Sequence, residues 1–160
     1  LTIENIKKNN LIANTKKGDL FLPWKNMKFD YIINDVSGIS NMVAKKSPWF
    51  NDFVPCDSGK DGVKLTIKII SQAKKYLNPK GVLQLPMISL SNEKKILKKA
   101  KKIFKNVRII EKADWFLPSE MQNLHKYLEN LKSKGHINFI KKFGRIICTT
   151  SIITCAIIKK

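Results

Sequence analysis

The sequence predicts an α/β fold whose β-sheet is mostly parallel. Short apolar runs bounded by polar residues alternate along the chain with segments in which apolar residues recur at helical spacing. The 160 residues are 43% hydrophobic and 27% charged, a composition that is ordinary for one compact domain with its own core. No repeat or low-complexity linker divides the chain, so residues 1–160 are expected to form a single domain.

The region before residue 60 is expected to contain one helix and two strands. Residues 1–11 have the pattern of the end of an amphipathic helix, which terminates at two asparagines. A short strand is expected before Gly18. The apolar run Phe29–Asn34 predicts a central strand that is buried on both faces. A loop rich in serine, proline and aromatic residues follows.

The clearest helix covers residues 61–77, where lysines form one stripe and apolar residues form another. Asp61 is its expected N-cap, and residues 78–81 (Asn-Pro-Lys-Gly) are expected to stop it. Gly59 and Gly62 are expected to shape the loop that enters the helix.

The second half of the chain continues the alternation. Residues 81–89 predict a buried strand, residues 91–104 a helix, and residues 107–116 another strand. An apolar stripe between residues 121 and 131 predicts a further helix, and the β-branched stretch after Arg145 predicts a closing strand. Helices that alternate with short apolar strands are typical of a parallel sheet.

The charge of the chain is unusual. Its 31 basic and 12 acidic residues give a net charge of +19. Only Arg108 and Arg145 are arginines, whereas readout of phosphates and bases favours the planar arginine fork over lysine. This composition favours lysines that form solvated helix faces over a dedicated phosphate-binding surface. A weak attraction to nucleic acid is expected in either case.

The cysteines and histidines predict neither disulfides nor a metal site. Cys56, Cys148 and Cys155 are odd in number and lack framework spacing, which favours reduced thiols in a cytoplasmic protein. His125 and His136 lie too far from them for a zinc site. No secretory leader opens the chain, and its longest apolar stretch is too short to span a bilayer, so no membrane association is expected.

Several segments occur in the order and spacing of a known family. The opening ENIKKNNL is similar to the helix end E-N-A-x-x-N-G-L, Gly18–Phe21 reads G-D-L-F, and FDYIIND fits F-D-x-I-x-x-N. The stretch from SGKDGV to NPKGVLQL resembles a G-G-x-D-G-L helix, an N-P-x-G turn and a strand. Together these segments resemble class I S-adenosylmethionine-dependent methyltransferases, most closely the release-factor glutamine methyltransferase (methyltransferase small domain) branch.

The resemblance implies a Rossmann-like methyltransferase sheet, mostly parallel with an antiparallel C-terminal strand. It covers nearly the whole chain, although its specific motifs lie in residues 1–85. The family's glycine-rich cofactor loop and ribose-binding acid have no match here, and the first residue is Leu1 rather than methionine. We therefore expect an N-terminally truncated catalytic domain, about its C-terminal two thirds, that lacks its first strands and binds S-adenosylmethionine poorly by itself.

The resemblance assigns three cofactor contacts. Asp19 would accept a hydrogen bond from the adenine amino group of S-adenosylmethionine, and Leu20 would lie beside the ring. Asn34, at the carboxyl end of a central strand, would contact the cofactor and act on the acceptor as a catalytic residue. The structural alternatives are a turn residue for Asp19 and a strand-end cap for Asn34.

The chain departs from the family after Asn34. The glutamine-modifying branch carries N-P-P-Y there, in which the Asn oxygen and a proline carbonyl bind the target NH2 and the Tyr packs on it. This chain instead reads N-D-V-S-G from Asn34, so the two prolines and the tyrosine are replaced by Asp35, Val36 and Ser37, and Gly38 follows. The main reason to expect an amide acceptor is therefore lost. Asp35 is a candidate catalytic residue that accepts a proton or hydrogen bond from another nucleophile, or else it caps a turn.

Aromatic residues near these positions have two interpretations. Trp49, Phe50 and Trp115 could stack on a substrate ring, but loop anchors that pack on the core are favoured. Cys56 is expected to be a bystander thiol, since no histidine lies near it in sequence.

The sequence thus predicts a monomeric S-adenosylmethionine-dependent methyltransferase whose acceptor stays open between a protein glutamine amide, RNA and a small molecule. The alternative is a catalytically silent methyltransferase-like module that binds RNA or a ribosomal partner through a lysine-rich surface.

Overall fold

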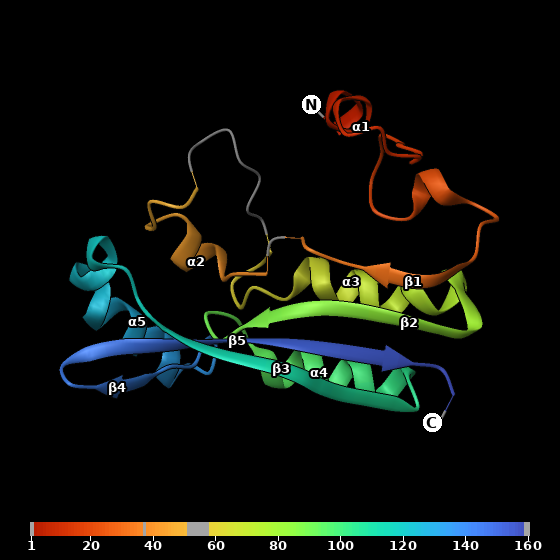
Figure 1. Cartoon of the computed structure of the whole chain (residues 1–160). Helices are drawn as coiled ribbons and strands as arrows, with labels where there is room; N and C mark the ends of the chain where they lie inside the picture. The colour runs from red at the N-terminus through yellow and green to blue at the C-terminus, as the bar shows by residue number, and fades with distance from the viewer. Residues whose placement is uncertain (1, 37, 51–57, 159–160) are drawn as a thin grey trace.

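The structure is a computed structural model that describes residues 2–36, 38–50 and 58–158. It is an α/β fold around a five-stranded mixed sheet (Figure 1). The strands are β1 (Phe29–Ile33), β2 (Leu77–Ile88), β3 (Asn106–Phe116), β4 (Ile140–Lys142) and β5 (Arg145–Ala156). The helices are α1 (Thr2–Lys8), α2 (Asn41–Ala44), α3 (Lys64–Ala73), α4 (Glu93–Ile103) and α5 (His125–Ser133), with 3-10 turns η1 (Leu22–Trp24), η2 (Lys74–Tyr76) and η3 (Ser119–Leu124). The predicted α/β class is confirmed.

The last strand runs against all the others. The strand order is β1-β2-β5-β3, and β4 pairs with the start of β5. β1 and β2 are parallel, while β5 is antiparallel to β2, β3 and β4. Strands β1 to β4 therefore share one direction, as the prediction of a mostly parallel sheet expects. Because β5 lies between β2 and β3, however, β1–β2 is the one parallel hydrogen-bonded pair among the described strands.

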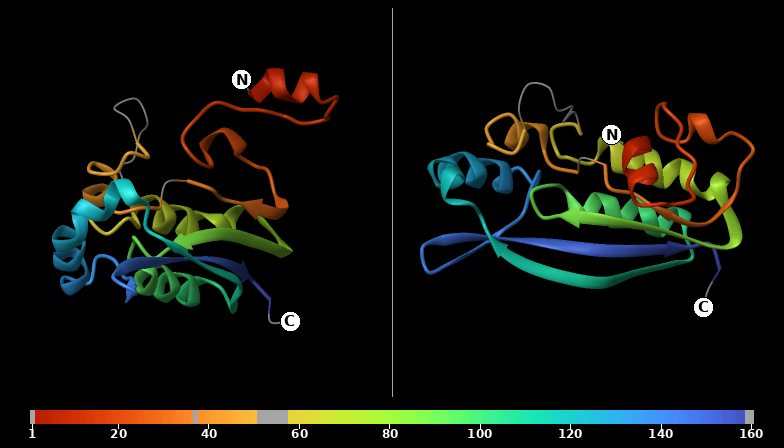
Figure 2. Two further views of the ribbon diagram at one scale, coloured as in Figure 1. Left: turned by 60° about the vertical axis from the view of Figure 1, so that its left-hand side comes forward. Right: turned by 45° about the horizontal axis from the view of Figure 1, so that its top comes forward.

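Helices α3 and α4 lie side by side on one face of the sheet and pack against each other (Figures 1 and 2). Alternate residues of β2, such as Leu83 and Leu85, are buried on that face, where Ile70 and Ile96 of the two helices meet them. The residues between them in β2, including Pro86, are only half-buried. The alternation shows that the described helices cover one face of the sheet much more than the other.

A second apolar cluster lies at the end of the sheet to which β1 and β2 point. Val43 of α2, Leu128 and Leu131 of α5, and Ile146 and Cys148 of β5 form its centre. α2 and α5 both lie at this end in Figure 1. The cluster fixes the segment after β1 against the sheet, at the edge where open α/β sheets bind ligands.

Two predictions about the first strands are wrong. Residues 11–17, where a short strand was expected, have no regular structure. β1 is not buried on both faces, because Tyr31 is 66% exposed and Ile33 is 74% exposed. The reason is topological: within the described chain β1 pairs with β2 alone and forms the edge of the sheet. An apolar run does not reveal how many neighbours a strand has.

The boundaries of the clearest helix also differ from the prediction. Val63, not Asp61, occupies the N-cap, and no side chain caps the helix there. The helix ends earlier than expected, at Ala73, and residues 77–81 belong to β2. Asp61 instead forms an ion pair with Lys95 of α4, with 2.8 Å between Oδ2 and Nζ. Asp61 therefore pairs with a lysine that is distant in sequence and does not cap α3, although local capping rules predicted that it would.

The two cysteines of β5 are predicted to be unreactive in the folded protein. Burial raises the pKa of Cys148 and of Cys155 to about 12, so both remain thiols at neutral pH. In a Cys56→Ser background, we expect a disulfide thiol reagent at pH 8 to label neither cysteine until urea unfolds the chain. Because the unfolded thiols ionise near pH 8.5, stability should fall as the pH rises from about 9 towards 12. Rapid labelling of the native protein would contradict this prediction.

Candidate functional site

Two hollows flank the carboxyl end of β1. The first, named the β1 pocket here, has a volume of about 300 Å³ and lies between β1, the segment from Leu20 to Trp24, and Ile69 of α3. The second, named the tryptophan pocket, has a volume of about 310 Å³ and lies between residues 35, 36, 38 and 39, Trp49 and the open face of β2 and β5. Asn34 lines the first pocket and Asp35 lines the second. The two adjacent residues thus face different hollows.

Asn34 ends the strand and turns the chain. Its N–H donates to the carbonyl of Gln84 at 2.9 Å, which adds one more bond to the β1–β2 ladder. Its side-chain Oδ1 accepts the N–H of Val36 at 3.3 Å, so Asn34 does act as a strand-end cap. The residue is only 7% exposed. Its Nδ2 makes no hydrogen bond to another described residue, which leaves this donor available towards the β1 pocket.

Leu20 is brought into the β1 pocket by a tight turn. Gly18 packs under Pro23, since a Cβ built on Gly18 would lie 2.3 Å from the Pro23 Cγ. The N–H of Leu22 donates to the carbonyl of Asp19 at 3.0 Å, and Leu20 takes a φ of +49°, a conformation uncommon for leucine. The turn places Leu20 against the apolar cluster between the sheet and helices α3 and α4. Leu20 also lies in the wall of the pocket that Asn34 lines.

Asp19 does not line the β1 pocket. Its carboxylate is exposed and pairs with Lys68 of α3, with 2.6 Å between Oδ2 and Nζ. An exposed pair of this kind contributes about 0–1 kcal/mol to stability. The expected adenine contact of Asp19 would require its carboxylate to leave Lys68. Sequence reasoning missed Lys68, which it assigned to the solvated stripe of its helix.

The aromatic residues after α2 form one wall of the tryptophan pocket. Trp49 and Phe50 both line it, and Trp49 is 39% exposed. Trp115 lies behind Trp49, with the ring centroids 5.8 Å apart and the ring planes tilted by 56°. The indole N–H of Trp115 donates to Thr150 Oγ1 at 3.0 Å, so Trp115 is anchored as the core interpretation expects. Cys56 and Ser37 lie outside the described residues.

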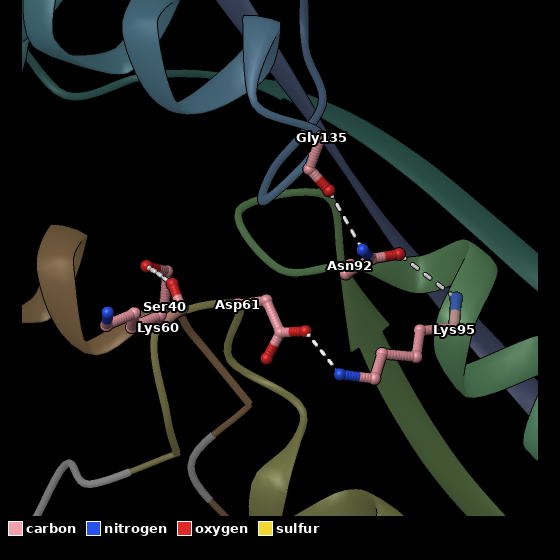
Figure 3. Close-up of polar contacts among 6 residues, drawn as sticks. All are labelled: Ser40, Lys60, Asp61, Asn92, Lys95 and Gly135. Atoms are coloured by element: carbon pink, nitrogen blue, oxygen red, sulfur yellow. Dashed lines mark hydrogen bonds and ion pairs between the residues drawn. The ribbon is translucent and has the colours of Figure 1, made fainter.

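A network of polar contacts holds the loop that enters α3. Ser40 Oγ donates to the carbonyl of Lys60, and Asp61 pairs with Lys95 (Figure 3). Asn92 caps α4 by accepting the N–H of Lys95 and donates from Nδ2 to the carbonyl of Gly135. These contacts join the segments that follow β1 and β2 to the start of α3.

The backbone is packed tightly at the same junction. The N–H of Ser40 donates to the carbonyl of Leu90, and the N–H of Asn92 donates to the carbonyl of Asp61. Gly62 lies between these loop segments and has a φ of +72°. A Cβ at this position would come within 2.5 Å of the Ser40 nitrogen. The prediction that Gly62 shapes the loop is confirmed, and the junction is closely packed next to Ile39, which lines the tryptophan pocket.

The remaining features narrow the chemistry. Among the described residues, no three histidine, cysteine, aspartate or glutamate side chains gather as a metal site would need. No helix in the described part of the chain has the length and apolar character required to cross a bilayer. Comparisons of the chain with known protein families, with curated proteins and with solved structures find no match.

Proposed function

We propose that this chain is part of an S-adenosylmethionine-dependent methyltransferase with a Rossmann-like sheet. The observation that carries the proposal is the meeting of Leu20 and Asn34 in the β1 pocket. The resemblance assigns both residues to the cofactor, although they come from separate motifs. The antiparallel C-terminal strand β5 agrees with the same family sheet.

The β1 pocket fits the nucleoside end of this cofactor. Its walls are mainly apolar and include the flat rings of Phe21 and Trp24, which suit a purine. The open edge of β1 and its exposed Tyr31 and Ile33 support the expectation that further strands complete the sheet. A protein in which residues 1–160 follow a segment that supplies these strands is called the extended protein below.

The proposal assigns a role to each residue of the two pockets. When bound, S-adenosylmethionine supplies an activated methyl group, whose transfer is an in-line displacement that depends on alignment. Leu20 would pack against the adenine, and the Nδ2 of Asn34 would donate a hydrogen bond within the same pocket. Asp35, which lines the tryptophan pocket, would accept a proton or a hydrogen bond from the methyl acceptor. The Asn34–Asp35 peptide therefore separates the cofactor side from the acceptor side.

The adenine contact of Asp19 can be tested against its ion pair. We expect Asp19→Ala in the extended protein to weaken S-adenosylmethionine binding by roughly 1–3 kcal/mol, the cost of a lost polar partner. Lys68→Met releases the carboxylate and is expected to leave binding unchanged or to strengthen it. Isothermal titration calorimetry measures both affinities.

The same titrations separate this role from a structural one. If Asp19 only pairs with Lys68, both variants keep the wild-type affinity, and the adenine assignment of Asp19 is wrong. If the wild-type extended protein binds no S-adenosylmethionine, the proposed function itself fails. The silent RNA-binding module would then be favoured, with affinity for RNA that falls steeply as salt rises.

A further inference from the structure

The aromatic and apolar lining of the tryptophan pocket suits a flat ring, and the pocket is also called the slot below. Its volume of about 310 Å³ is at the small end of ligand sites and admits one aromatic ring system. The rings of Trp49 and Phe50 form one side, and Pro86 and Ile88 of β2 form the apolar floor with Thr150. Flat apolar walls on this scale favour planar partners, because stacking needs two parallel surfaces.

The stacking surface is held in place before any ligand arrives. Trp115 supports Trp49 from behind, and its own N–H is satisfied by Thr150. Phe50 packs against the second core cluster. Trp49 nevertheless remains 39% exposed, so part of a supported ring faces solvent. A ring that is already ordered loses little side-chain entropy when it binds a partner.

Among the described residues that line the slot, Asp35 is the one carboxylate. Asp35 is exposed, lines the pocket, and makes no ion pair or side-chain hydrogen bond with another described residue. An ionised carboxylate only accepts hydrogen bonds, so it selects a ring that carries N–H groups. Exocyclic amines of nucleobases have this chemistry, and acidic side chains pair with them.

The positive charge of the chain favours a polyanion as the carrier of the ring. Lys45 and Lys46, both exposed, immediately follow α2 and lead into the segment that carries Trp49. The whole chain has a net charge of +19. Lysines of this kind contact phosphates without reading sequence, while aromatic surfaces hold the bases. An aromatic side chain of a protein partner would use the slot but not the lysines.

We infer that the tryptophan pocket binds an unpaired nucleobase of a single-stranded nucleic acid, stacked on Trp49 with an exocyclic amine towards Asp35. The lysines contact the phosphates on either side. This inference rests on the proposed function only in one respect, namely that the bound base would then be the methyl acceptor. Base binding itself needs no S-adenosylmethionine.

The test compares two oligomers that carry equal charge. Fluorescence anisotropy gives the affinity of the 160-residue chain for a labelled single-stranded RNA octamer and for an abasic octamer with the same phosphates. We expect the base-containing octamer to bind roughly 5- to 100-fold more tightly, the effect of stacking a base on an aromatic ring. Both affinities should fall in parallel as salt rises, because the phosphate contacts are the same. DNA octamers of the same sequence identify which polymer is preferred.

Two variants and a control locate the effect. Trp49→Ala is expected to reduce the ratio between the two octamers to about one. Phe143→Ala, which removes an aromatic ring that is 84% exposed at the β4–β5 turn, is expected to leave the ratio unchanged. Asp35→Ala should weaken the binding of octamers whose bases carry an exocyclic amine (adenine, cytosine or guanine) while the stacking remains. Circular dichroism checks that each variant is folded.

The outcomes separate this inference from the proposed function. Equal affinity for base-containing and abasic octamers, or an unchanged ratio in a folded Trp49→Ala variant, overturns the inference and leaves lysines that attract any polyanion. Binding of S-adenosylmethionine by the extended protein can succeed or fail independently. Selective binding of a tryptophan-containing peptide in place of the octamer would assign the slot to a protein partner and also overturn the inference.

Discussion

Gly62→Ala is expected to destabilise the protein by roughly 3–5 kcal/mol, a loss large enough to threaten folding of a domain this size. The added Cβ would meet the Ser40 nitrogen at 2.5 Å and the Ile39 carbonyl carbon at 2.6 Å. Both are backbone atoms fixed by the loop junction, so neither can rotate away. Thermal unfolding followed by circular dichroism should show Tm lower by roughly 10 °C.

The chain offers a matched control for this substitution. Gly135 has a φ of +71°, almost the same as Gly62, but nothing lies within 4 Å of its added Cβ. Gly135→Ala therefore measures the conformational strain alone, which is roughly 1–2 kcal/mol. The difference between the two variants is the cost of the clash. Equal losses of stability would mean that the junction around Gly62 is not closely packed.

Asn34→Ala in the extended protein is expected to lower methyl transfer by roughly 100-fold, the usual effect of removing one aligned donor from a reacting centre. The affinity for S-adenosylmethionine should change much less, because the apolar walls of the β1 pocket are untouched. Radiolabelled methyl transfer to total RNA and to total protein measures the rate, and calorimetry measures the affinity.

Asn34→Asp separates alignment from the turn. The aspartate keeps an oxygen that can accept the Val36 N–H, as Asn34 Oδ1 does at 3.3 Å, but it has no amide donor. We expect this variant to keep the wild-type Tm and to lose transfer as Asn34→Ala does. Wild-type transfer by Asn34→Asp would show that Asn34 is a strand-end cap and nothing more.

The sequence predicted where helices and strands lie along the chain better than it predicted which strands pair in the sheet. Hydrophobic periodicity predicted the positions of α3 and α4 and of the apolar segments within β2 and β5, because these patterns depend on local spacing. It did not show that β5 inserts between β2 and β3, since pairing between distant strands leaves no local pattern. For the same reason, the exposure of Ile33 on the edge strand was missed.

The candidate site divides in the same way. The motif residues Leu20 and Asn34 were predicted from their types and order, and they line one pocket. The Asp19–Lys68 pair joins residues that are distant in sequence, so no spacing rule could find it. Trp49, Phe50 and Trp115 were expected to be anchors. Phe50 and Trp115 pack against the second core cluster, whereas Trp49 remains 39% exposed, because burial of a loop aromatic depends on tertiary packing.

The structure explains why a glycine occupies position 62, at the end of the SGKDG segment. Its place in the motif indicated a loop before a helix, and in the structure Gly62 lies against the backbone of Ile39 and Ser40 and the side chain of Ser91. A residue with a side chain would push apart the segments that follow β1 and β2. Ile39, against which Gly62 packs, also lines the tryptophan pocket, so tight packing at Gly62 helps to hold one wall of that pocket.

The central claim is that the β1 pocket holds the methyl donor next to Asn34. Nuclear magnetic resonance of the isotope-labelled extended protein, titrated with S-adenosylhomocysteine, tests it directly. We predict the largest amide shifts at Leu20 and Asn34, with none at Leu131, which is buried in the second core cluster. Saturable shifts confined to residues outside the β1 pocket, or no shifts at all, would contradict the claim.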